Sequence, residues 1–167
     1  MIAQEPSYFQ TERITIMFDI LVYLFETYAQ PSACPETAVL ARKLSAIGFE
    51  QEDIAAALEW LAGLESLAFE QRPSTLANSQ RIYCVVELAK LSMECRGFLC
   101  FLENSGVIDP VVREMIIERA MVLRDQTVSL DKLKIIVLMV LWRRDESLDT
   151  LLLEELLSAE HHSSLAH

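Results

Sequence analysis

The chain has very little glycine and proline. Only four glycines and five prolines occur among its 167 residues, and these are the two residue types that most weaken helices. Hydrophobic residues make up 52% of the chain, which is enough at this length to form a core without disulfide bridges or a structural metal. The composition therefore favours a mainly helical protein over a sheet-rich one.

Metal-binding spacings are missing. The four cysteines are Cys34, Cys84, Cys95 and Cys100, no two of which form a CxxC pair, and the three histidines all lie after residue 160. Zinc sites are typically built from closely spaced pairs of ligands. We therefore expect neither a metal nor another cofactor. We also expect all four cysteines to be reduced thiols, as is usual in the cytoplasm.

Catalytic motifs are missing as well. The chain has no phosphate-binding loop, no GxSxG and no HExxH motif. Paired carboxylates such as Glu114 and Glu118 share a helix face without a neighbouring base, which is typical of a solvated face. We expect no enzymatic activity.

Basic charge is in short supply. Residues 1–80 carry 11 acidic and 4 basic residues (net −7), and residues 81–167 carry 14 acidic and 10 basic residues (net −4), which gives −11 for the chain. Neither half offers a basic patch for phosphate groups, so the charge is better suited to solubility or to a basic partner. We predict a cytoplasmic protein without membrane spans, since no apolar run approaches about 20 residues and no signal-peptide pattern opens the chain.

Two apolar stripes with helical spacing flank Gly48. Leu40, Leu44 and Ile47 form the first stripe, and Gly48 is placed to end that helix in the left-handed region. The second helix begins near Glu50. Its apolar positions are Ile54, Ala57, Leu58, Leu61 and Leu64. The spacing is compatible with a helix-turn-helix and with an ordinary helical hairpin.

The segment after this pair loses the helical period. Leu67–Glu70 and Gln80–Val85 are short, and the second contains β-branched and aromatic residues, so both are predicted strands joined by a polar loop. A preceding apolar helix from Met17 to about Tyr28 completes the order of a winged helix. We predict a mainly α protein with a winged-helix-like module over residues 17–86; the alternative is a pair of irregular crossing segments.

Helical periodicity returns for the rest of the chain, which predicts a helical module over residues 87–160. One helix runs from Glu87, with Gly97 in its middle, where close approach of another helix is expected. Asp109, Ser129 and Ser147 are predicted N-caps of the next three helices. Residues 1–16 are predicted to be a loose extension and residues 161–167 a frayed tail.

The apolar stripes also predict the core. Its members are Leu21, Phe25, Leu44, Ile54, Leu58, Leu61, Phe98, Leu102, Met115, Ile116, Leu133, Val137 and Leu141.

Several segments, in unbroken order from Met17 to about Leu157, resemble the bacterial Smg protein family. They are Met17–Tyr28, Gly48–Leu61, Arg81-Ile82-Tyr83, Cys95–Glu103, Arg113–Arg119 and Leu133–Leu141. The resemblance implies a small cytoplasmic protein of proteobacteria and supplies no activity, cofactor or site residue. Genes of the Smg family often lie near DNA-processing genes, so the resemblance also implies a link to nucleic-acid housekeeping.

We expect a non-enzymatic regulatory or adaptor protein that acts through protein–protein interaction; the alternative is a winged-helix DNA-binding regulator. The helix from Glu50 to about Leu64 carries four carboxylates and neither lysine nor arginine. Phosphates would repel that helix, so duplex DNA is not expected to bind through it. Candidate contacts for a protein partner are Trp60, Tyr83, Arg72 and Arg81, although Trp60 and Tyr83 also suit ordinary core positions.

Overall fold

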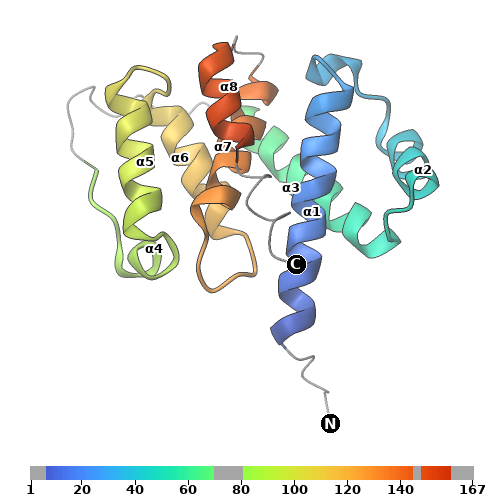
Figure 1. Cartoon of the computed structure of the whole chain (residues 1–167), viewed down its shortest axis with the longest axis horizontal. Helices are drawn as coiled ribbons and strands as arrows, with labels where there is room; N and C mark the ends of the chain where they lie inside the picture. Colours follow the sequence, from blue (N-terminus) through green and yellow to red (C-terminus); the bar gives the residue numbers. More distant parts are fainter. Residues whose placement is uncertain (1–6, 70–80, 145–147, 159–167) are drawn as a thin grey trace. The chain divides into compact units, whose positions relative to one another are not determined.

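The computed structural model describes residues 7–69, 81–144 and 148–158, and within them it is entirely helical (Figure 1). The prediction of a mainly α protein is confirmed. The elements in order are α1 (Ser7–Thr27), the single 3-10 turn η1 (Pro31–Ala33), α2 (Thr37–Ile47), α3 (Gln51–Phe69), α4 (Val85–Lys90), α5 (Met93–Asn104), α6 (Pro110–Met121), α7 (Leu130–Arg143) and α8 (Thr150–Leu157). They belong to two compact units, Met1–Ala62 and Gly63–His167.

The predicted winged-helix hairpin is wrong. Leu67 lies inside α3, which continues to Phe69, and Val85 is the first residue of α4. The only β-type pairing among the described residues is an isolated bridge between Leu91 and Val128. Leu67 follows the buried Leu64 at a spacing of three, so it extends the helical period of α3 rather than starting a strand. The loop that was predicted between the strands falls largely on residues 70–80, outside the described residues.

The turn between α2 and α3 forms as predicted. Gly48 has a φ of +116° and ends α2 in the left-handed region. Its N–H donates to the carbonyls of Leu44 and Ser45, and the N–H of Phe49 donates to the Leu44 carbonyl at 3.2 Å. These bonds satisfy carbonyl groups that the end of α2 would otherwise leave open.

In the first unit, α1, α2 and the first part of α3 each bury apolar side chains. Leu21 of α1, Leu44 of α2 and Ile54 of α3 are buried as predicted, and Trp60 joins them at 4% exposure. The predicted core residues Phe25, Leu58 and Leu61 are only partly buried.

The first helix is longer than predicted. Helix α1 begins at Ser7, well before the expected start at Met17.

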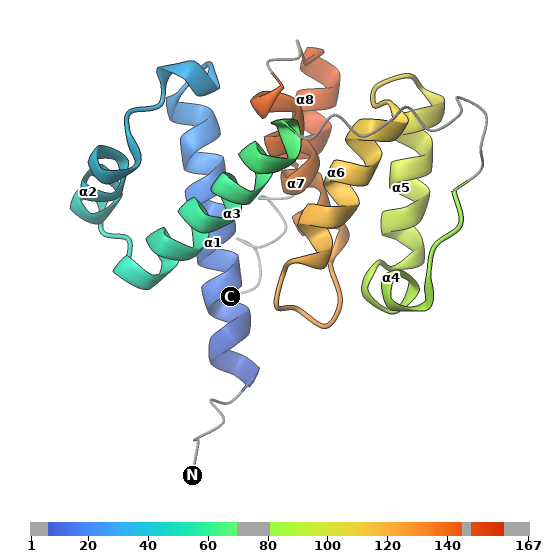
Figure 2. The same cartoon turned by 180° about the vertical axis from the view of Figure 1, so that it is seen from behind.

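The second unit is built around α7. Every residue from Leu133 to Trp142 is buried, because α7 packs against α5, α6 and α8 (Figures 1 and 2). A helix covered on several sides needs apolar residues all round, which explains the unbroken apolar run. Burial is confirmed for six predicted core residues: Leu102, Met115, Ile116, Leu133, Val137 and Leu141. Phe98 is only partly buried.

Helix caps follow the sequence at two of three positions. The Asp109 side chain accepts from the Val112 N–H at 2.7 Å, and the Ser129 side chain accepts from the Lys132 N–H at 3.3 Å. The third prediction is wrong, because Asp149 is the N-cap residue of α8. Ser147 itself lies outside the described residues.

The long helix predicted from Glu87 is interrupted. Leu91 adopts an extended conformation, and its neighbour Ser92 caps α5 by accepting from the Cys95 N–H at 3.2 Å. The N–H of Val128 donates to the Lys90 carbonyl at 2.8 Å, which holds the chain at this break. The expected neighbour of Gly97 is missing too: a Cβ built there meets no atom within 4 Å in the described structure. Divided in this way, the segment leaves the six-residue α4 as a separate element.

Candidate functional site: a short helix with its apolar side outward

The polarity of α4 is inverted relative to an ordinary surface helix. None of its residues is buried. Val85 and Val86 are 82% and 65% exposed, Leu88 is 43% exposed, and the preceding Ile82 is 89% exposed. Its charged residues Glu87 and Lys90 are less exposed than these apolar ones. Ile82, Val85, Val86 and Leu88 are called the α4 surface below.

Glu87 attaches the start of α4 to the protein. Arg81 donates to both of its carboxylate oxygens, from Nη1 at 2.8 Å and from Nη2 at 2.7 Å. The Cys84 N–H donates to the same carboxylate at 2.9 Å and so satisfies the open amide at the helix start. The hydrogen bonds from Arg81 lower the pKa of Glu87 to about 2.

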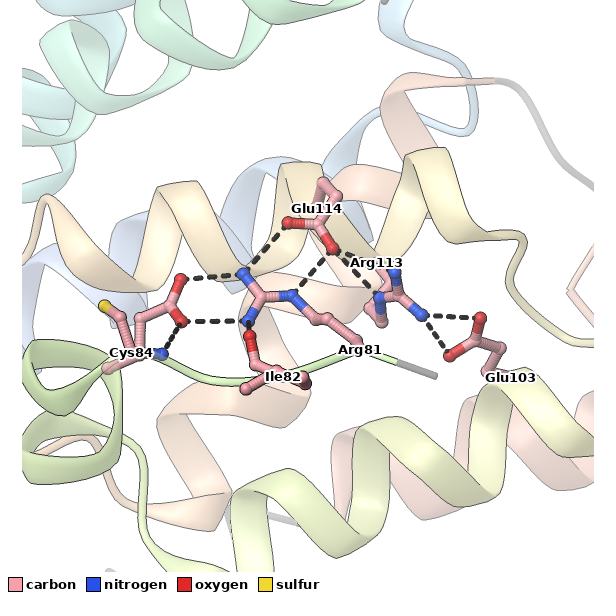
Figure 3. A network of polar contacts seen from close by, with 7 residues as sticks. Arg81, Ile82, Cys84, Glu103, Arg113 and Glu114 are labelled. Carbon is pink, nitrogen blue, oxygen red and sulfur yellow. Dashed lines mark hydrogen bonds and ion pairs between the residues drawn. The ribbon is translucent and has the colours of Figure 1, made fainter. Parts of the chain in front are cut away.

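Arg81 also reaches α6. Its Nε donates to Glu114 at 2.8 Å and its Nη2 donates to the second oxygen of Glu114 at 3.0 Å. Figure 3 shows the Arg81 guanidinium beside the Glu114 carboxylate, with Arg113 on the other side of that carboxylate. One arginine therefore uses its fork of donors to join two carboxylates on different helices.

Arg113 extends the network to α5. It donates to Glu114 from Nε at 3.0 Å, and its Nη1 donates to both oxygens of Glu103 at 2.7 Å (Figure 3). Burial lowers the pKa of Arg113, but the bonds to Glu103 and Glu114 outweigh it and the pKa is raised. We call the whole set the ionic anchor: Arg81, Glu87, Glu103, Arg113 and Glu114.

Lys90 attaches the other end of α4. Its Nζ donates to the Met121 carbonyl at 2.8 Å and to the Leu123 carbonyl, at the end of α6. A cation placed at these carbonyls complements the negative end of the α6 dipole. Burial lowers the pKa of Lys90, and the charge of Asp125 opposes that change. Both charged residues of α4 thus serve to attach it to α6 or to the segment before it.

The charged groups of the ionic anchor are bound to one another. Each of its three carboxylates already accepts hydrogen bonds from an arginine. In the described parts of the chain, no group of three or more His, Cys, Asp or Glu side chains could hold a metal ion. None of the four cysteines forms a disulfide bridge in the structure, and Cys95 is buried. The α4 surface, by contrast, is apolar and exposed.

The four candidate contacts from the sequence have different positions. Arg81 is central to the ionic anchor, and the ring of Tyr83 lies 4.6 Å from its guanidinium carbon. Arg96 lies 5.9 Å from the same ring. Trp60 is buried in the first unit, and Arg72 lies outside the described residues. Of the four, the structure brings Arg81 and Tyr83 together.

The α4 surface has little signal in the sequence. Its β-branched residues matched a strand, and six residues are too few for a helical period to be recognised. The one local signal is the spacing of Cys84 and Glu87, which matches the two ends of a capping box. Cysteine is not one of the usual N-cap residues, so this spacing is a weak signal for a helix start at Val85.

Comparison with known proteins places all of these residues in one family. A family model described as "Protein of unknown function (DUF494)" matches residues 17–167. The chain belongs to this family. It is 54% identical over 146 residues to the Protein Smg homolog of Azoarcus sp., covering 86% of this chain and 94% of that protein. It is 53% identical over 145 residues to the Aromatoleum aromaticum homolog, with the same two coverages.

The resemblance to the Smg family is thereby confirmed. The Protein Smg homolog of Bordetella pertussis is 49% identical over 148 residues, covering 86% of this chain and 96% of that protein. No solved structure matches the chain. In the described part of the chain, none of the helices is both long and apolar enough to cross a membrane.

Proposed function

We propose that the protein is a non-enzymatic cytoplasmic adaptor that binds another protein through the α4 surface. The observation that supports this proposal is the inverted polarity of α4. Fully burying a Val, Leu or Ile side chain is worth about 1.5–3 kcal/mol, and the α4 surface forgoes most of that gain at Ile82, Val85 and Val86. Grouped exposed apolar side chains are typical of interaction sites.

The attachment of α4 supports the same proposal. Arg81 and Lys90 hold the helix at both ends through hydrogen bonds to α6 and to Glu87. The apolar side chains are therefore presented on a fixed backbone, and an ordered surface loses less conformational entropy when a partner binds. A protein partner can cover the α4 surface without disturbing the ionic anchor behind it.

A DNA-binding role has less support. Glu52 and Glu59 are exposed on α3, the helix that would have to enter the groove, and a duplex would repel them. Arg81 is engaged with Glu87 and Glu114. The side chains exposed on the α4 surface are apolar and offer no donor to phosphate or base edges.

Quantitative co-purification from the native cytoplasm tests the proposal. Val85→Ser/Val86→Ser removes the centre of the α4 surface, and Ile47→Ser/Leu151→Ser removes two exposed apolar side chains from other helices as a matched control. We expect at least one protein to be retained by the wild type and the control and lost by the first variant. An identical set of retained proteins for all three would contradict the proposal.

A further inference from the structure

A second exposed apolar feature lies on α5. Met93, Gly97 and Phe101 are spaced four residues apart, so they share one face of the helix over about 12 Å. Met93 is 79% exposed and Phe101 is 61% exposed. Gly97 between them is exposed as well. These three residues are called the α5 stripe.

Gly97 has no role in the fold that would require glycine. Its backbone is helical, and the glycines with positive φ are Gly48 and Gly106. A Cβ at Gly97 would meet nothing within 4 Å in the described structure. A glycine inside a helix costs about 1 kcal/mol relative to alanine, so this one weakens α5 without serving a contact to the residues that the structure describes.

Between two large apolar side chains, Gly97 leaves a notch. The absence of a side chain lets another backbone come close, and Met93 and Phe101 can pack on either side of it. Helices that pack with small residues between them reach the shorter end of the usual 8–10 Å axial separation. The α5 stripe therefore has a shape onto which a second helix can pack.

The charge of the surroundings indicates what kind of helix fits. Three cations of segment 81–96 have internal acceptors: Arg81 binds Glu87, Lys90 binds the Met121 carbonyl, and the Arg96 Nε donates to the Ser92 carbonyl. Glu94, next to Met93, is an exposed carboxylate. The chain as a whole carries −11, so a complementary ligand is apolar on one face and basic at its flanks.

We propose that the α5 stripe binds a helix of a partner protein whose contact face is apolar and whose flanks carry lysine or arginine. The inference rests on the adaptor function and adds a second, chemically defined contact to it. A second copy of this chain is a poorer fit, because two molecules of charge −11 repel each other.

Fluorescence anisotropy with a synthetic peptide tests the inference. The probe is a labelled amphipathic helix of about 18 residues, with leucine at positions i, i+3, i+4 and i+7 and lysine elsewhere; a second peptide has glutamate in place of lysine. For the lysine peptide, we expect Met93→Ser/Phe101→Ser to raise Kd about tenfold or more. The control Ile47→Ser/Leu151→Ser should leave Kd unchanged, and the glutamate peptide should bind the wild type about tenfold more weakly.

Gly97→Gln separates a binding role from a structural one. Glutamine favours helices over glycine and has open space at this position, so this variant should be more stable in urea yet bind the lysine peptide about tenfold more weakly. Equal Kd values for wild type and both stripe variants, or no binding of the lysine peptide, would overturn the inference. So would a wild-type dimer in sedimentation that Met93→Ser/Phe101→Ser dissociates.

The two proposals fail in different ways. One outcome is that the lysine peptide binds wild type and the α5-stripe variants equally, while Val85→Ser/Val86→Ser still loses a co-purifying protein. In that case the α5 stripe is not a helix-binding site, and the adaptor function stands. If the peptide result is as expected and co-purification is the same for all variants, the α4 surface is not the binding site.

Discussion

The guanidinium group of Arg119 occupies space that is open only because Gly63 has no side chain. A Cβ at Gly63 would lie 2.0 Å from Nη1 of Arg119 and 3.0 Å from its guanidinium carbon. Arg119 is 7% exposed, and burial lowers its pKa. The charged end of Arg119 lies close to the α3 backbone at Gly63. Glycine is needed here because of this close approach.

Gly63→Ala should therefore destabilise the protein although alanine favours helices. The methyl group forces the buried guanidinium to move, and overpacking of this kind costs about 1–3 kcal/mol. Gly97→Ala is the matched control: it has open space and should stabilise by up to about 1 kcal/mol. Urea denaturation of both variants measures the difference. A Gly63→Ala midpoint at or above the wild-type value would show that Arg119 does not need the glycine.

At the scale of elements, α4 is held by polar contacts where other helices are held by apolar ones. Its own residues contribute no buried side chain, so Arg81 and Lys90 take the place of a core. An ion pair at the surface is worth about 0–1 kcal/mol, but Arg81 joins two carboxylates and is itself only 16% exposed. We therefore expect the ionic anchor to contribute more to the stability of α4 than an exposed ion pair contributes to the stability of its helix.

Arg81→Met should release α4 because it leaves Glu87 and Glu114 without their shared donor. Hydrogen bonds to charged groups are worth about 1.5–3 kcal/mol, and we expect a loss of that size in urea denaturation together with faster hydrogen exchange over residues 85–90. Arg143→Met is the matched control, since its partner Glu65 is 48% exposed. Its cost should stay below about 1 kcal/mol. Equal losses for both arginines would show that the anchor is an ordinary surface contact.

Acid should weaken the same element. Arg81 lowers the pKa of Glu87 from 4.5 to about 2, so the stability that Glu87 contributes is complete above pH 4.5 and is lost as the pH falls towards 2. Glu87→Gln lacks this contribution at every pH. The difference in unfolding free energy between wild type and Glu87→Gln should therefore be largest near pH 6 and shrink below about pH 4. A difference that stays constant from pH 6 to about pH 3 would contradict the low pKa.

The sequence was sufficient for features that depend on neighbouring residues. Gly48, Asp109 and Ser129 act at helix ends as expected, because capping and left-handed turns are decided within a few residues. The predicted core residues Leu133, Val137 and Leu141 of α7 are buried as well. Arg81 could not be placed in this way, since its two carboxylate partners lie 6 and 33 residues away in sequence. The outward face of α4 depends on those same distant contacts, so the candidate site was visible only in the structure.

At the scale of the whole molecule, charge governs which partners can approach. The net charge of −11 is spread over both halves of the sequence, and long-range repulsion acts against polyanions. We predict no micromolar binding of duplex DNA at ~50 mM salt, where electrostatic binding is strong. Glu52→Gln/Glu59→Gln is the control for repulsion at α3. Wild-type binding that weakens with salt and is strengthened by this variant would revive the DNA-binding alternative.

The central claim is that α4 faces water with its apolar side and is held by its polar one. Urea denaturation of Val85→Thr/Val86→Thr tests it most directly, with Val137→Thr in the fully buried α7 as the reference. A hydroxyl costs little in water but about 1–3 kcal/mol where no partner exists for it. We predict that the double variant stays within about 0.5 kcal/mol of the wild type while Val137→Thr loses at least 1 kcal/mol, about the lower limit for a buried hydroxyl. A loss in the double variant as large as that in Val137→Thr would show that the chain itself covers the α4 surface.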